Sequence, residues 1–225
     1  MLCTASFAQR RPEANITLAQ KKHTFHLGVK GGLDFTSMTQ PDECDLYDGS
    51  GLGFSGGIAG KFRFNQATPN SPAGTGLLGA GFELKYKQNT VKTIGTDEAG
   101  EENANLSLGY FEVPVFVQIY PFYKTNSMNN LYIEVGPDFA GTLSRKPESL
   151  TVDNVTYLLD KDGSKLKGMD VRLMAGLGYD FAVSNSLIGI NARYYLGTSK
   201  LAGNFNSKMN TLEVSLSWMF NVGKF

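Results

Sequence analysis

The chain has 225 residues, a formal net charge of zero, and 26 Gly beside 15 Phe and 10 Tyr. This length suits one β-rich domain or at most two small ones, and a neutral charge gives no reason to propose nucleic acid as a partner. No apolar run approaches the roughly 18 residues of a membrane-spanning helix, and two Cys cannot build a disulfide framework. Glycines and aromatics in these amounts are typical of a chain of strands.

The first residues resemble the end of a secretory signal. Ser6 and Ala8 are small residues at the two positions that define a cleavage site before Gln9. We therefore interpret residues 1–8 as the remnant of a signal, with an ordinary short N-terminus as the alternative. Cys3 is either removed with that signal or lipidated, although the residues of a lipobox are missing. Residues 9–23 are polar and predict a lead-in segment.

Apolar and polar residues then alternate in a rhythm that predicts about eight strands within residues 24–220. In the fourth of these strands the alternation changes phase, which predicts a bulge near Gly109 and Tyr110. The expected strands are 24–38, 52–64, 78–88, 106–120, 131–143, 170–181, 187–196 and 211–220.

The connections between these strands differ in length. Those after the first, third, fifth and seventh strands are mostly long and polar, including 89–105 with its acidic centre DEAGEE and 144–168, the longest. The others are generally shorter turns. Outer-membrane barrels have long extracellular loops and short periplasmic turns, so both termini are expected on the periplasmic side.

The last strand has one unbroken apolar face about ten residues long, enough for a tilted strand to cross a bilayer. It ends in aromatics, as membrane strands do at the headgroups, and it resembles the C-terminal signal read by the barrel assembly machinery. Phe225 is out of phase with this face, so 221–225 is predicted as a short tail. The residues of the expected assembly signal are Leu212, Val214, Leu216, Trp218 and Phe220.

The sequence thus predicts an all-β protein, an eight-stranded antiparallel up-and-down transmembrane β-barrel in the outer membrane of a Gram-negative bacterium, surrounded by its lipid. The alternative is a soluble lipocalin-like ligand carrier, which has the same alternation turned inside out. Aromatics near the expected periplasmic strand ends favour the membrane barrel, because they form a girdle. The girdle residues are Phe25, Phe62, Phe64 and Phe181.

Charged residues fall on the polar face of the strands. A conducting pore or a proton path is one interpretation of these charges. A filled, electrostatic core is the other, and we favour it because an eight-stranded barrel is only wide enough to be filled by its side chains. Charges placed there need partners. The predicted lumen network is Lys30, Arg63, Glu83, Glu112, Asp138, Arg172 and Arg193.

Signatures of catalysis and of metal binding are weak. The two histidines, His23 and His26, come before or at the start of the first strand, away from the outer leaflet where lipid-modifying barrels carry a catalytic His. Cys44 lies in a loop whose carboxylates could bind calcium weakly, but a solvated acidic loop is the favoured interpretation; these carboxylates are Asp42, Glu43, Asp45 and Asp48. We expect no catalytic residue, cofactor or metal, and therefore no enzyme.

Several segments resemble the PorT-type outer-membrane β-barrel proteins of Gram-negative bacteria over roughly residues 24–220. They are LGVKGGLDFTSM, GFELKYK, YFEVPVF, EVGPDFAG and ARYYLGTSKL. The resemblance implies an eight-stranded barrel and little about activity, although one branch of the family serves a protein secretion system. The hypothesis is a non-enzymatic structural component, or a small accessory subunit of a larger outer-membrane assembly that acts through its loops, with a small passive pore as the alternative.

Overall fold

The computed structural model describes residues 23–38, 50–64, 76–97, 100–125, 127–146, 149–152, 155–158, 169–183, 186–198 and 208–224. The expected signal remnant, nearly all of the lead-in and the loop around Cys44 lie outside these ranges. The described strands are β1 (Thr24–Met38), β2 (Ser50–Phe64), β3 (Leu78–Asp97), β4 (Gly100–Ile119), β5 (Leu131–Lys146), β6 (Ser149–Val152), β7 (Val155–Leu158), β8 (Met169–Val183), β9 (Ser186–Gly197) and β10 (Met209–Lys224).

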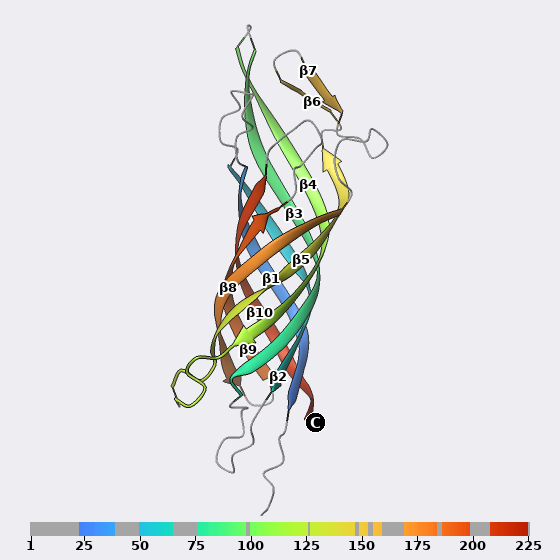
Figure 1. The fold of residues 1–225 in the computed structure, drawn as a ribbon. Helices are drawn as coiled ribbons and strands as arrows, with labels where there is room; N and C mark the ends of the chain where they lie inside the picture. The colour runs from blue at the N-terminus through green and yellow to red at the C-terminus, as the bar shows by residue number, and fades with distance from the viewer. Residues whose placement is uncertain are drawn as a thin grey trace, which may run out of the picture.

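Eight strands close into one barrel in the order β1-β10-β9-β8-β5-β4-β3-β2, as Figure 1 shows. Every neighbouring pair in the barrel is antiparallel, which confirms the predicted fold class. We call the end where β1 begins and β10 finishes the termini end, and the opposite end, where β3 meets β4, the loop end. Among the described residues, no helix has the length and apolarity needed to cross a membrane.

The segment 89–105 is not the polar loop that the sequence predicted. β3 runs to Asp97 and β4 begins at Gly100, and the two strands stay paired from Val91 opposite Leu106 to Asp97 opposite Gly100. Polar composition alone does not exclude a strand, and the β-branched residues that are frequent in this segment favour one. The resulting hairpin rises above the barrel at the loop end (Figure 1).

Two other boundaries differ from the prediction. Within the expected loop 144–168, β5 continues to Lys146, and β6 pairs with β7 as a small separate hairpin. At the chain end, β10 continues to Lys224 instead of finishing at Phe220, because Thr24 and Phe25 of β1 still offer it partners. A register shift beside Phe25 absorbs the phase break that made 221–225 look like a tail.

The bulge predicted near Gly109 and Tyr110 of β4 lies instead in the neighbouring strand β5. The register between β4 and β5 shifts between Gly109 and Tyr110, which pair with Ser144 and Thr142, so the extra residue is Leu143 of β5. Leu108 is buried inside the barrel with Tyr110 rather than turned outward. Its apolar side chain belongs to the lumen, which the alternation alone did not reveal.

Some strand glycines make room for large side chains inside the barrel. A Cβ on Gly81 would lie 2.5 Å from the ring of Phe116, and a Cβ on Gly178 would lie 2.5 Å from the hydroxyl of Tyr132. Contacts this short are not tolerated, so these glycines are the space into which the two rings fit. In both cases the ring belongs to the residue paired with the glycine on the neighbouring strand, so the lumen is closely packed along the wall.

Candidate functional site

The inner face of the barrel carries many charged side chains of both signs. Successive residues of a strand point to opposite faces, so every second residue enters the lumen. Acidic and basic groups are mixed there. The acids are Asp34, Glu83, Glu112, Glu134, Asp138, Asp170, Asp180 and Glu213, and the bases are Lys30, Lys61, Arg63, Lys85, Lys87, Arg172 and Arg193.

Arg193 of β9 stands at the centre of one half of this charge. Its guanidinium lies 2.7 Å from Glu83 of β3 and also contacts Glu134 of β5. Lys30 of β1 then joins Glu83, at 3.1 Å, to Glu213 of β10, at 3.3 Å. Each carboxylate is therefore met by a cation from a different strand, which offsets the high cost of removing it from water.

Arg172 of β8 organises the other half, between Glu112 and Asp138. Lys85 connects the two halves, because its ammonium lies 3.2 Å from Glu112 and also contacts Glu213. Lys87 extends the chain of contacts to Asp34, 2.7 Å away. These contacts form one continuous network, called the lumen network below; its members are Lys30, Asp34, Glu83, Lys85, Lys87, Glu112, Glu134, Asp138, Arg172, Arg193 and Glu213.

Two further groups lie outside the lumen network, nearer the termini end. Lys61 pairs with Asp180 across the barrel, with its ammonium 2.7 Å and 2.8 Å from the two carboxylate oxygens. Arg63 donates to the Asn130 side chain at 2.8 Å and to the Asn129 carbonyl at 2.7 Å, and its guanidinium stacks on Tyr120. Arg63 thus closes the end of the barrel and does not neutralise a carboxylate.

The structure brings together six of the seven residues predicted for the network and separates Arg63 from them. The charged residues that the predicted network leaves out share the same strand alternation, which could have placed them in the lumen. They are Asp34, Lys61, Lys85, Lys87, Glu134, Asp170, Asp180 and Glu213.

Buried apolar and aromatic side chains continue the filling of the lumen on both sides of the charges. Toward the loop end lie Val91, Leu108 and Met209, all almost fully buried. Toward the termini end, Tyr120 and Tyr132 are buried against each other, with ring centroids 5.7 Å apart. The charges thus lie between two less polar layers. Shielded from water there, the charges interact with one another more strongly than they would in water.

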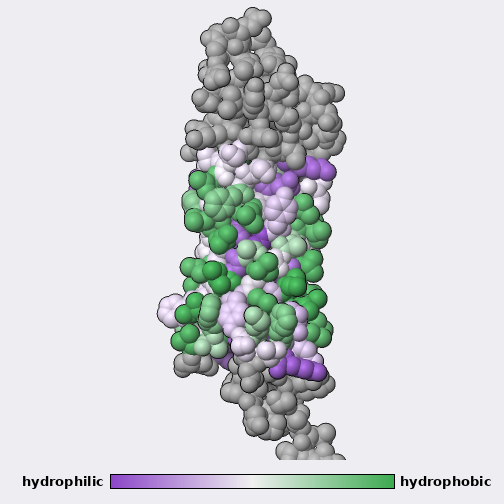
Figure 2. All heavy atoms as spheres, turned by 90° about the vertical axis from the view of Figure 1, so that its left-hand side faces the viewer, coloured by the Kyte–Doolittle hydropathy of each residue, from purple (hydrophilic) through white to green (hydrophobic). Residues whose placement is uncertain are grey.

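The outer face of the barrel is apolar all the way round the described strands. Figure 2 shows hydrophobic side chains covering the wall between the two ends on one side of the barrel. The residues of the expected assembly signal all point outward there: Leu212, Val214, Leu216, Trp218 and Phe220. This arrangement contradicts the soluble carrier, whose apolar residues would line an internal cavity and whose charges would face water.

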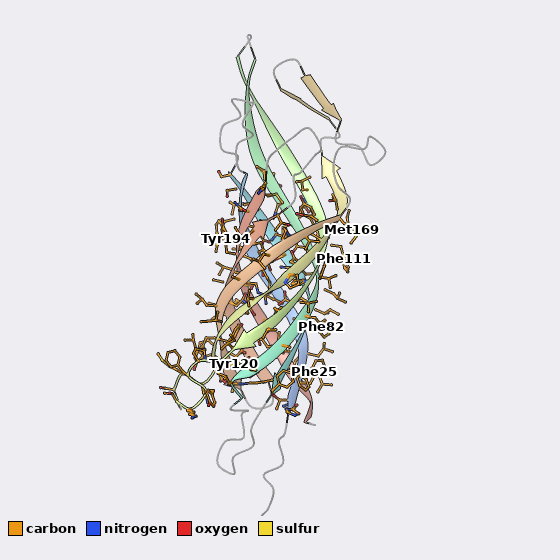
Figure 3. All side chains as sticks on the ribbon, in the orientation of Figure 1. Phe25, Phe82, Phe111, Tyr120, Met169 and Tyr194 are labelled. Atoms are coloured by element: carbon orange, nitrogen blue, oxygen red, sulfur yellow. The ribbon has the colours of Figure 1, made fainter. Side chains whose placement is uncertain are left out.

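Aromatic side chains gather at the termini end of this wall. Phe25 is paired with Phe62, and Figure 3 places Phe25 at that end. The rings of Phe62 and Phe64 are 4.9 Å apart, and Phe181 lies in a second group with Tyr179. His23 contacts both rings of the first group. Its environment is therefore aromatic, with no acid or nucleophile in these contacts.

The described residues do not suggest an obvious reaction. No group of three or more His, Cys, Asp or Glu in this part of the chain is arranged to hold a metal ion. The acids and bases of the lumen network are held against one another, so they neutralise each other rather than address a substrate. The arrangement can do one thing well, which is to fill and close the barrel.

A family profile described as "Outer membrane protein beta-barrel domain" matches residues 7–203. A search of curated proteins found no significant match. Among solved structures, Neisserial surface protein A (NspA) is 14% identical with a TM-score of 0.45, over 87% of this chain and 96% of that one. OprG from Pseudomonas aeruginosa is 10% identical with a TM-score of 0.45, over 89% and 96%. Ail of Yersinia pestis, in complex with the heparin analogue sucrose octasulfate, is 13% identical with a TM-score of 0.40, over 87% and 99%.

Proposed function

Because the chain belongs to the outer membrane protein beta-barrel domain family and lies in the outer membrane of a Gram-negative bacterium, we propose that it is a non-enzymatic barrel that acts through its loops. It is either a structural component of that membrane or a small accessory subunit of a larger outer-membrane assembly. The termini end faces the periplasm and the loop end faces outward in this proposal, as the long connections at the loop end suggest.

The filled lumen is the observation that carries the proposal. Arg193 and Arg172 each contact two carboxylates, and both guanidinium groups are almost fully buried. A conducting pathway would have to separate these contacts and leave buried charges without partners, which typically costs several kcal/mol. A barrel closed in this way has only its outer surfaces with which to act.

The β3–β4 hairpin is the surface best suited to a partner. Beyond Val91 and Leu106 its two strands pair only with each other among the described strands of the barrel. Both strands of the hairpin are longer than the other strands of the barrel, so the hairpin extends past the part of the barrel that crosses the membrane. Projecting elements of this kind commonly carry binding. The resemblance to PorT-type proteins supports a secretion-associated assembly as the finer form of the proposal.

Affinity purification in mild detergent tests the subunit proposal. The matched variant replaces residues 93–104 by Asn-Gly, which joins the paired residues Lys92 and Asn105 through a two-residue hairpin turn. We expect a stoichiometric membrane complex with the full chain and loss of that complex with the shortened hairpin, while heat-modifiable gel migration stays unchanged. A full-length barrel that always purifies alone, or one that alters lipid A, contradicts the subunit proposal.

Single-channel recording tests the closed lumen against the passive pore. The full chain, reconstituted in a planar bilayer, should give no stable conductance. Detergent without protein and heat-unfolded protein are the controls for leakage. A reproducible conductance that Arg193→Ala or Glu112→Ala abolishes would reverse the proposal, because those side chains would then line a path for ions.

A further inference from the structure

The turn between β4 and β5, described over residues 120–125 and 127–130, has a defined shape and projects sideways. In Figure 1 it extends outward beside the termini end of the barrel instead of continuing along its axis. Successive backbone hydrogen bonds fold it: Tyr123 N–H donates to the Tyr120 carbonyl at 3.2 Å and Thr125 N–H to Phe122 at 2.9 Å. Met128 N–H donates to Thr125 at 3.3 Å. We call residues 120–125 and 127–130 the lateral turn.

The lateral turn is fastened to the lipid-facing side of the neighbouring strand β8. The hydroxyl of Tyr179 donates to the Ser127 carbonyl at 3.1 Å, and the backbone N–H of Asp180 donates to the Asn130 carbonyl at 3.2 Å. The Tyr179 ring packs edge-on against Phe181, 4.7 Å between centroids, and Phe181 is exposed on the outer wall. The turn therefore lies at the level of the aromatic girdle.

The exposed side chains of the lateral turn are of two kinds. Phe122 is 44% exposed and Met128 is 51% exposed, so neither is used to pack the barrel. Lys124 is exposed as well, and its ammonium lies 5.4 Å from the centre of the Tyr123 ring. Aromatic and long apolar groups beside a lysine are the combination found where hydrocarbon meets headgroups, since the ring and stem stay in the apolar layer while the charge reaches phosphate.

We propose that the lateral turn binds the phospholipid interface, with Phe122 and Met128 below the headgroups and Lys124 on lipid phosphate. Continuity selects lipid as the occupant. The outer wall beside the turn is the lipid-facing surface of an outer-membrane barrel, and Ile133 and Phe181 continue it to the base of the turn. A bilayer that covers this wall also reaches a turn projecting sideways from it. This binding of lipid by the lateral turn is independent of the partner proposed above for the loop end.

Fluorescence quenching tests where Phe122 lies. Phe122→Trp is made in a Trp218→Phe background, since Trp218 is the one tryptophan of the chain. The protein is folded into vesicles that contain lipid brominated either near the glycerol or near the chain end. We expect the indole at position 122 to be quenched more by the shallow label than by the deep one, to emit at shorter wavelength than in the unfolded protein, and to be shielded from acrylamide. Wild-type protein provides the reference for a wall-facing indole.

Two results would overturn the proposal that the lateral turn binds lipid. Acrylamide quenching as strong as in unfolded protein would mean that the lateral turn stands in water. Shielding from both acrylamide and brominated lipid would mean that protein covers it, through a second copy or a partner. Heat-modifiable migration identifies variants that have not folded, and Met128→Trp in the same background then provides an independent position for the same measurement.

The contribution of Lys124 is measured by lipid preference. Shallow-brominated phosphatidylglycerol and phosphatidylcholine are compared at equal mole fraction as quenchers of the indole at position 122. Attraction of a lysine near a surface predicts a preference of about two- to fivefold for the anionic lipid. Lys124→Gln should bring the ratio close to one without changing the depth. Equal quenching by both lipids with Lys124 present would refute the phosphate contact.

Discussion

The pair of Lys61 and Asp180 offers a direct measurement of how dry the lumen is. The ammonium lies 2.7 Å and 2.8 Å from the two carboxylate oxygens, and the two side chains are only 7% and 5% exposed. The ammonium also lies 4.1 Å from the centre of the Tyr132 ring. Because the pair is separate from the lumen network, it can be changed without disturbing the other ion pairs.

Lys61→Met keeps the length of the side chain but leaves the Asp180 carboxylate without its cation. Removing one partner of a buried pair typically destabilises a protein by about 3–5 kcal/mol, because the remaining charge stays buried and uncompensated. Lys61→Met with Asp180→Leu removes both charges and should cost about 0–2 kcal/mol, since buried pairs are often replaceable by apolar groups. The expected coupling between the two sites is therefore large, and the double variant is more stable than the single one.

Urea unfolding of the barrel folded in vesicles, followed by the fluorescence of Trp218, measures these free energies. Lys208→Met is the matched control, because it makes the same change at an exposed lysine and should alter the free energy of unfolding by no more than about 1 kcal/mol. A cost below about 1 kcal/mol for Lys61→Met would equal that of an exposed pair. Water would then reach Asp180, and the argument for a closed lumen would fail.

Two further predictions concern the packing of the barrel and its assembly. Gly81→Ala should cost about 1–3 kcal/mol, because its Cβ would meet the Phe116 ring at 2.5 Å. Gly31→Ala, on the outer wall with its nearest neighbour 3.8 Å away, should be tolerated in the same urea unfolding assay, and equal costs would contradict the packing. Trp218→Asp and Phe220→Ala should lower the amount of heat-modifiable barrel in the outer membrane more than Phe225→Ala does, and equal tolerance would mean that these residues are not an assembly signal.

The sequence predicted the faces of the strands far better than their ends. Alternation requires only a period of two, so it correctly turned Leu216 outward and Glu83 inward. It says nothing about where pairing stops. The β3–β4 hairpin continues past Val91 because two polar strands can pair in water, and composition alone resembles a loop there.

The partners inside the lumen could not be predicted for a related reason. Alternation gives the face of a residue but not its height along the closed barrel, which depends on the stagger of all the strands. Arg63 shows this limit. It has the alternation of a lumen residue but lies at the termini end with Asn130, while Arg193 meets Glu83, a residue 110 positions away in the chain.

The ion pairs depend on closure in a way that the outer wall does not. Lys61 on β2 reaches Asp180 on β8, and these strands are not neighbours in the sheet. Lys30 and Glu213 meet across β1 and β10, the contact that closes the barrel. An open sheet in lipid would keep its apolar outer face but lose these pairs, leaving charges without partners. The charges therefore favour the closed barrel over an open one, and they have a reason to be present without any substrate, ion or proton passing among them.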